Sequence, residues 1–276
     1  MSLRSNNTRP TFRKVSRNLA RLAERPTPEN VHKFRTSSRR VEVLVSDLAV
    51  RRNANDRKLL KLLSRLRRKA GRVRDLDVQS AALRSLKMPE QARRKSQLLR
   101  TLAEERAQRE KRLVKSLDKK TVAEVRKRLK RAAAGLEISQ DANPLSLARQ
   151  ELNALQVEQS AISESTLHQY RIAGKRARYI AELADKDPEA KRLIALLNHL
   201  QDILGDWHDW VQLAERAERL FGDVHESALV AALRNVTRAK FRQAVNALAE
   251  TRASLAARKP LIAAPALRPP RQAAVA

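Results

Sequence analysis

Two histidines each begin a row of basic residues at helical spacing. At about 100° per residue, each row falls on one narrow stripe of a helix, with its members roughly one turn (~5.4 Å) apart. The first row is His32, Arg35 and Arg39, and the second is His168, Arg171, Lys175 and Arg178. Guanidinium groups bind phosphate oxygens bidentately, and a neutral imidazole can donate one hydrogen bond. The rows therefore predict binding of a ligand that carries several phosphates.

The opposite side of each of these helices is apolar. In the first helix it carries Phe34, Val41, Val45 and Leu48, and in the second Tyr170, Ala177, Ile180, Ala181 and Ala184. The basic rows are therefore predicted to lie on faces that point away from the core. A merely solvated face would mix positive and negative charges, yet residues 31–41 contain no acid. The absence of acids therefore favours a helix face that binds a ligand over one that is only solvated.

The two rows belong to an internal repeat. Residues 32–40 and 168–176 share the pattern H-x-[FY]-R-x-x-x-[RK]-R at a separation of 136 residues. A second match, at a separation of 134 residues, pairs Leu66–Gly71, Arg74 and Asp75 with Leu200–Gly205, His208 and Asp209. Two nearly equal separations indicate two homologous helical bundles that meet near residues 135–143.

The elements that carry the rows are predicted to be helices throughout. Apolar residues recur at steps of three and four between Phe12 and Arg258, and alternating β-branched residues are absent. Breaks are expected at residues 26–28, 87–89, 135, 143–144, 187–188 and 222. At three of these breaks Thr27, Asn143 or Asp187 stands directly before a proline, which is a helix start signal.

Composition excludes several classes of protein. The 276 residues include 59 Lys and Arg against 30 Asp and Glu, a net charge of +29, which predicts a polyanionic partner. Because the chain has no cysteine, disulfide frameworks, cysteine nucleophiles and zinc sites with sulfur ligands are excluded. Its five glycines lack the spacing of phosphate-binding loops, which excludes P-loop and dinucleotide-binding folds. Charged residues interrupt every apolar stretch before membrane-spanning length, so we expect a soluble, cytoplasmic protein that has no membrane partner.

The histidines are expected to bind rather than to catalyse. Neighbouring cations should lower the pKa of His32 and His168 and keep both imidazoles neutral near neutral pH. No carboxylate stands beside either histidine to orient it for acid–base work. An enzyme that uses either histidine as a phosphate acceptor is the less favoured hypothesis.

Four further groups of residues are candidate parts of a site. Lys61, Arg65, Arg68 and Arg72 form another basic stripe, and the basic run 119–131 is as consistent with a solvated face as with ligand contact. His199, Asp202, Asp206 and Asp209 resemble a metal-binding set, but we favour salt bridges to neighbouring Arg, with Asp206 or Asp209 as a helix cap after Gly205, and predict no metal. Trp207 and Trp210 are expected in the core with satisfied N–H groups.

These motifs resemble the conserved histidine α-helical domain, the CHAD family, from about Phe12 to Leu255. The segments that carry the resemblance are 31–40, 71–77, 167–179 and 200–209, and the second histidine segment is the most specific. The resemblance implies an all-α fold of two four-helix bundles related by pseudo-two-fold symmetry around a basic groove or pore. It also implies binding of inorganic polyphosphate and association with polyphosphate granules.

The predicted organisation has four parts: a disordered segment 1–10, a first bundle 11–138, a second bundle 139–258 and a disordered tail 259–276. The predicted function is polyphosphate binding without catalysis or cofactor, with sequence-independent nucleic-acid binding as the alternative; oligomeric state is left open. The predicted polyphosphate-binding residues are His32, Arg35, Arg39, Arg40, Arg65, Arg68, Arg72, His168, Arg171, Lys175, Arg176 and Arg178.

Overall fold

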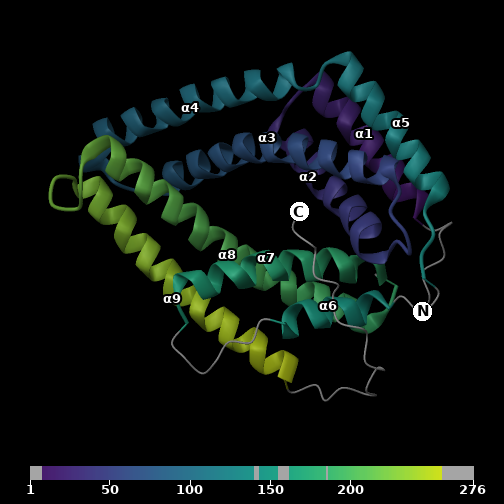
Figure 1. Cartoon of the computed structure of the whole chain (residues 1–276). Helices are drawn as coiled ribbons and strands as arrows, with labels where there is room; N and C mark the ends of the chain where they lie inside the picture. Colours follow the sequence, from purple (N-terminus) through teal and green to yellow (C-terminus); the bar gives the residue numbers. More distant parts are fainter. Residues whose placement is uncertain (1–7, 140–142, 155–161, 185, 257–276) are drawn as a thin grey trace, which may run out of the picture.

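The protein is built from α-helices, as the computed structural model shows for residues 8–139, 143–154, 162–184 and 186–256 (Figure 1). The first half of the described chain contains α1 (Arg9–Glu24), α2 (Pro28–Val43), α3 (Ala54–Ser85), α4 (Ala92–Lys115) and α5 (Lys119–Gly135). The second half contains α6 (Pro144–Asn153), α7 (Glu164–Ala181), α8 (Pro188–Phe221) and α9 (Ala228–Ala256). The expected all-α fold is confirmed.

Helix starts follow the expected capping chemistry. The Thr27 hydroxyl accepts a hydrogen bond from the Asn30 amide, and Asn143 and Asp187 cap α6 and α8 in the same way. A short π-helix (Leu44–Leu48) continues α2, and 3₁₀ turns precede α4 (Pro89–Gln91) and follow α7 (Glu182–Ala184). At the end of α8, Gly222 has φ +80°, a backbone conformation that L side chains rarely adopt. These local signals therefore set the starts of α2, α6 and α8 and the end of α8.

Two helices are long enough to serve more than one core. Helices α3 and α8 have 32 and 34 residues, and each extends about 50 Å. The first part of α3 packs with α1, α2 and α5, whereas Leu76 and Leu83 near its other end join a cluster with α4, α8 and α9. The two halves therefore share buried apolar surface.

The first half has one helix more than the resemblance implies. Helix α4 packs along the outer part of α3 and reaches α8 and α9, while α1, α2, α3 and α5 surround the first core, to which the end of α4 adds Leu113. In Figure 1, α4 runs along the top of the molecule above α3. The pseudo-two-fold relation between the halves stays a prediction.

Two boundary predictions need correction. Helix α8 continues through Gly205, so neither Asp206 nor Asp209 caps a helix there. Helix α1 begins at Arg9, within the segment 1–10 that we expected to be disordered, because Pro10 is favourable at a helix start. Residues 1–7 and the predicted disordered tail 259–276 lie outside the described residues.

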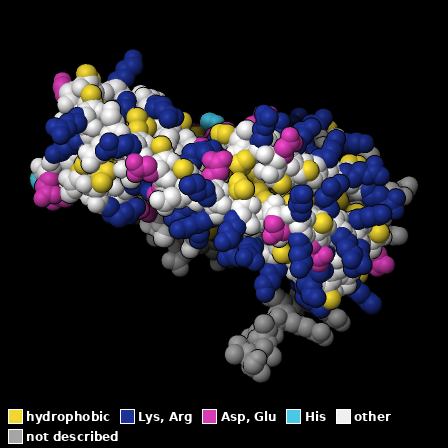
Figure 2. Space-filling model, turned by 90° about the horizontal axis from the view of Figure 1, so that it is seen from above, with side chains coloured by type: hydrophobic (Ala, Val, Ile, Leu, Met, Phe, Trp, Pro, Cys, Tyr) yellow, Lys and Arg dark blue, Asp and Glu magenta, His cyan; other side chains and the backbone are white. Residues whose placement is uncertain are grey.

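Most basic side chains lie in the first half of the sequence. Residues 1–140 contain 40 Lys and Arg against 14 Asp and Glu, whereas residues 141–276 contain 19 against 16. Figure 2 shows Lys and Arg crowded over the end of the molecule formed by α1 and α5.

No helix of the described residues is both long and apolar enough to cross a bilayer.

Candidate functional site

The two halves enclose a cavity of about 830 Å³. Its walls come from α2 and α3 of the first half and from α7 and α8 of the second, with Ser46 and Asp47 of the π-helix at one side. Eight of the lining residues are basic and four are acidic; the basic ones are Arg35, Arg39, Arg67, Arg74, Arg171, Lys175, Arg176 and Arg178. The cavity is therefore a cationic site to which both halves contribute.

The sequence repeat converges on this cavity. Arg35 and Arg39 of α2 face it from one side, and their counterparts Arg171 and Lys175 of α7 face it from the other. Helix α2 packs on α7, and α3 packs on α8. Residues that match at a separation of 136 in the sequence thus become neighbours around one space.

A glycine makes room for one of these arginines. The Arg35 guanidinium lies so close to Gly71 of α3 that a Cβ at that position would collide with Nη1. Arg35 Nη1 also donates to the Arg67 carbonyl oxygen at 3.4 Å. At Gly205, the matching position of α8, an added Cβ would meet nothing within 4 Å. Gly71 therefore permits a close approach that its counterpart does not need.

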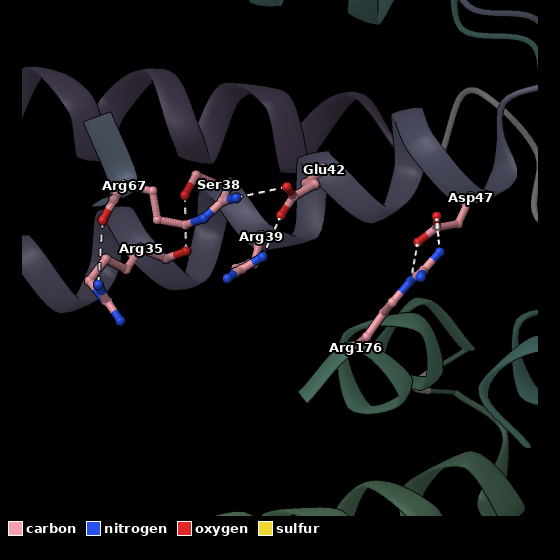
Figure 3. Close-up of polar contacts among 7 residues, drawn as sticks. All are labelled: Arg35, Ser38, Arg39, Glu42, Asp47, Arg67 and Arg176. Atoms are coloured by element: carbon pink, nitrogen blue, oxygen red, sulfur yellow. Dashed lines mark hydrogen bonds and ion pairs between the residues drawn. The ribbon is translucent and has the colours of Figure 1, made fainter. Parts of the chain in front are cut away.

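Several lining arginines are neutralised by protein carboxylates (Figure 3). Glu42 accepts from Arg39 Nη1 at 2.8 Å and from Arg67 Nη2 at 2.7 Å. Arg176 of α7 reaches across to Asp47, with Nη2 at 2.7 Å from Oδ1. The Arg176–Asp47 pair joins the two halves at the edge of the cavity.

Four lining cations have no such partner. Within the described part of the chain, Arg35, Arg74, Arg171 and Lys175 make no ion pair. Burial, reinforced by Arg171 and Arg35, lowers the pKa of Lys175 to about 8. Burial likewise lowers the pKa of Arg35 and of Arg171. A bound polyanion would relieve this penalty because it supplies the missing negative charge.

Two carboxylates and a histidine lie among these cations. Burial raises the pKa of Asp209 to about 6 against the lowering effect of Arg171, and it also raises the pKa of Asp75. Burial and then the neighbouring Arg171 lower the pKa of His208 to about 4. His208 is therefore neutral at neutral pH and can donate one hydrogen bond.

The two predicted histidines occupy different places. His32 lines the cavity, and its pKa is lowered first by burial and then by Arg74 and Arg35. The like-charge effect that we expected is present, but burial is the larger cause. His168 is exposed and outside the cavity lining, with its ring 5.8 Å from that of His208.

Four other predicted residues lie outside this cavity. Arg40 pairs with Glu182 at 2.6 Å, which links α2 to the turn after α7. Arg65, Arg68 and Arg72 are exposed on α3 and line neither this cavity nor three other well-defined hollows of the described chain. The basic run 119–131 forms α5 and lines none of these hollows either. Their contact with a ligand stays a prediction.

The lining residues that were not predicted include Arg67, Arg74, Gln201 and His208. Arg74 and His208 occupy matching positions of the second repeated motif, so the repeat itself carried the signal that would have found them. Arg67 and Gln201 are matching positions of the same motif at a separation of 134, but the two side chains differ in type, and their burial depends on contacts between helices. Gln201 is 7% exposed, and its Nε2 has no hydrogen-bond partner among the described residues.

The metal-like group and the tryptophans have structural surroundings. Asp206 forms a salt bridge at 2.8 Å, with Lys240 and not with the expected Arg, and accepts from Trp210 Nε1 at 3.0 Å. Within the described residues, His199, Asp202 and Asp209 form no ion pair. Both tryptophans are buried, but the Trp207 N–H has no partner in the described chain, contrary to our expectation. Within the described ranges, no three His, Cys, Asp or Glu side chains could together hold a metal ion.

Comparison with known proteins identifies relatives of this chain. The family model described as "CHAD domain" matches residues 8–218. The crystal structure of the CHAD domain from the plant Ricinus communis superimposes with a TM-score of 0.63 and 21% identity, covering 90% of this chain and 89% of that one. PptA from Streptomyces chartreusis gives a TM-score of 0.65 and 16% identity, covering 92% and 98%. No curated protein matches the sequence significantly.

Proposed function

Because the chain belongs to the CHAD domain family, which is linked to polyphosphate binding, we propose that it binds inorganic polyphosphate in the cavity between its two halves. The observation that supports this proposal is the set of four unpaired cations Arg35, Arg74, Arg171 and Lys175. Each half supplies two of them. A ligand with several adjacent phosphates can neutralise all four at once.

The surrounding groups fit an extended phosphate ligand. Arg39 and Arg178 also line the cavity, although Glu42 and Glu182 pair with them, and neutral His32 and His208 supply hydrogen-bond donors. The buried Gln201 amide adds a donor that the described protein does not use. Charge-assisted hydrogen bonds from guanidinium groups are the strong contacts in such a site, and each phosphate can accept several.

The proposed activity is binding without chemical turnover. His32 and His168 are assigned the role of hydrogen-bond donors, since neither forms a hydrogen bond to a carboxylate within the described chain. A carboxylate partner is what orients a catalytic imidazole. Incubation with radiolabelled polyphosphate and a divalent cation tests this assignment. Phosphate release, or a labelled protein that is lost in a His32→Ala/His168→Ala double variant, would overturn it.

Nucleic acid is the competing polyanion. A phosphate backbone would be attracted by the same surface and would give the same steep salt dependence. With only 3% aromatic residues, however, the chain offers few side chains on which single-stranded bases could stack. Polyphosphate should therefore retain the site when duplex DNA is added at equal phosphate concentration, and displacement by the DNA would favour the alternative.

Calorimetry at moderate salt provides the direct test. Long-chain polyphosphate should bind much more tightly than orthophosphate, and Arg171→Gln should weaken that binding about tenfold or more, since a charge-assisted contact contributes about 1.5–3 kcal/mol. Arg192→Gln is a matched control, because Arg192 is exposed on α8 and forms no ion pair with any described residue. Equal affinity for orthophosphate and polyphosphate, or equal losses in both variants, would refute the cavity as the site.

Association with polyphosphate granules in the cytoplasm follows from this binding and is proposed with it. A fluorescently labelled protein should co-localise with polyphosphate granules in cells. The Arg171→Gln variant should become diffuse, whereas Arg192→Gln should stay on the granules.

A further inference from the structure

A second cationic hollow adjoins the central cavity. It measures about 430 Å³ and lies where α1 and α2 meet the end of α7. Its lining shares His32, Thr36, Arg178 and Tyr179 with the central cavity. The two spaces are therefore neighbours on either side of these four residues.

Three cations of α1 form the outer wall of this hollow. Lys14, Arg17 and Arg21 are three and seven residues apart, so they occupy one face of the helix. All three are exposed, and their side chains make no ion pair with any described residue. The opposite face of α1 is buried in the first core through Phe12, Val15, Leu19 and Leu22.

The acids near this hollow are already engaged. Glu182 pairs with Arg40 at 2.6 Å, and Glu29 pairs with Lys33 on the exposed surface of α2. Helix α1 has no acid in its first turn, and Arg21 lies in its last turn. Like charges one turn apart destabilise a helix, so the α1 row is explained more readily by a bound anion than by helix stability.

The second half has no equivalent row. Helix α6 carries one cation, Arg149, and this cation pairs with Glu189 of α8. The excess positive charge of the chain lies almost entirely within residues 1–140. An anion that leaves the central cavity towards α1 therefore meets a row of cations that α6 does not offer.

Arg178 and His32 line both the central cavity and the hollow on α1, so they could contact a polyphosphate chain that extends from one into the other. Arg178 lies over the Tyr179 ring at 4.6 Å and donates to Asn198 Oδ1 at 2.7 Å, which fixes its position. Its Nε lies 3.8 Å from Glu182 Oε1, an ion pair, but makes no hydrogen bond within the described chain. His32 faces both spaces as a weakly basic donor.

We propose that the hollow on α1 is a second anion subsite, which binds the part of a long polyphosphate chain that extends beyond the central cavity. This inference rests on the proposed function. A chain that reaches both subsites binds the second one intramolecularly, so its affinity exceeds that of a short chain. The one-sided subsite thereby makes the protein select long polyphosphate.

A triple variant, Lys14→Gln/Arg17→Gln/Arg21→Gln, tests the proposal against two probes, tripolyphosphate and long-chain polyphosphate. Affinity for the long chain should fall about tenfold to a hundredfold at about 0.1 M salt, and the slope of log Kd against log salt should decrease by about 2, since each lost contact removes about 0.7. Affinity for tripolyphosphate should change less than about twofold.

The matched control is Arg93→Gln/Arg100→Gln/Lys111→Gln on α4. These side chains are exposed and form no ion pair within the described chain, and their substitution removes the same charge from the same half. Equal losses in the two triple variants, or an equal loss for both probes, would show a long-range effect of charge and overturn the subsite. If the wild-type protein bound polyphosphate but the α1 variant bound the long chain normally, only this inference would fail. Absence of binding by the wild-type protein would refute the proposed function as well.

Discussion

Lys175 should make polyphosphate binding sensitive to pH in a range where few other side chains titrate. Burial and the neighbouring Arg171 and Arg35 lower its pKa to about 8. The free protein therefore holds this lysine charged at about pH 7 and largely neutral at about pH 9. Asp209, whose pKa is raised to about 6, is already ionised throughout this range.

The size of the effect follows from proton linkage. A polyanion in the cavity favours charged Lys175 and raises its pKa, so binding is accompanied by proton uptake. The charged fraction of the free lysine falls from about nine-tenths to about one-tenth between pH 7 and pH 9, and affinity should decrease about tenfold, or about 1.4 kcal/mol. The sign is fixed: affinity falls as pH rises.

Calorimetry with long-chain polyphosphate in buffers of different ionisation enthalpy measures the affinity and the number of protons taken up on binding. Near pH 8 the wild-type protein should take up about half a proton per site occupied. Lys175→Arg is the control, because a guanidinium stays protonated throughout and its binding should show neither the decrease nor the uptake. A wild-type affinity that is constant from about pH 7 to about pH 9, or an equal decrease in Lys175→Arg, would refute this account.

Three other substitutions test the geometry of the cavity by calorimetry and thermal unfolding. Gly71→Ala should displace the Arg35 guanidinium and weaken polyphosphate binding about tenfold, whereas Gly205→Ala should leave binding unchanged and stabilise the protein by about 0.5–1 kcal/mol; equal effects on binding would contradict the close approach. Arg171→Ala should weaken binding with little change in melting temperature, because a buried cation without an ion pair is removed; a large loss of stability would make it structural. Gln201→Leu should weaken binding about fivefold without destabilising the fold, since its buried Nε2 has no partner among the described residues; unchanged affinity would exclude ligand contact.

The helices and their faces were predictable because they depend on nearby residues. Phe34 and Val41 are buried and His32 is exposed on α2, as the three- and four-residue spacing required. Thr27 and Asn143 cap their helices through backbone amides two or three residues away. At Gly205 the local signal was misleading, since packing on both sides keeps α8 continuous through a residue of low helix propensity.

The repeat predicted much of the site because homologous positions met around one cavity. Arg35 and Arg171 were identified in this way, and the second repeated motif held the signal for Arg74 and His208. Arg65, Arg68 and Arg72 have the same spacing and yet lie outside the cavity. Spacing along a helix defines a shared face, but it does not determine what that face meets.

The sequence by itself determined the helical fold, the core faces and the presence of two matching cationic rows. Only the tertiary structure decided which of these cations form ion pairs with protein carboxylates and which are left available to bind a ligand. Arg176 is paired because Asp47, far away in the sequence, lies beside it, whereas Lys175 on the same helix has no ion-pair partner within the described residues. The physical reason is that helix periodicity is set by contacts within a turn or two, while charge pairing and burial depend on how distant helices pack.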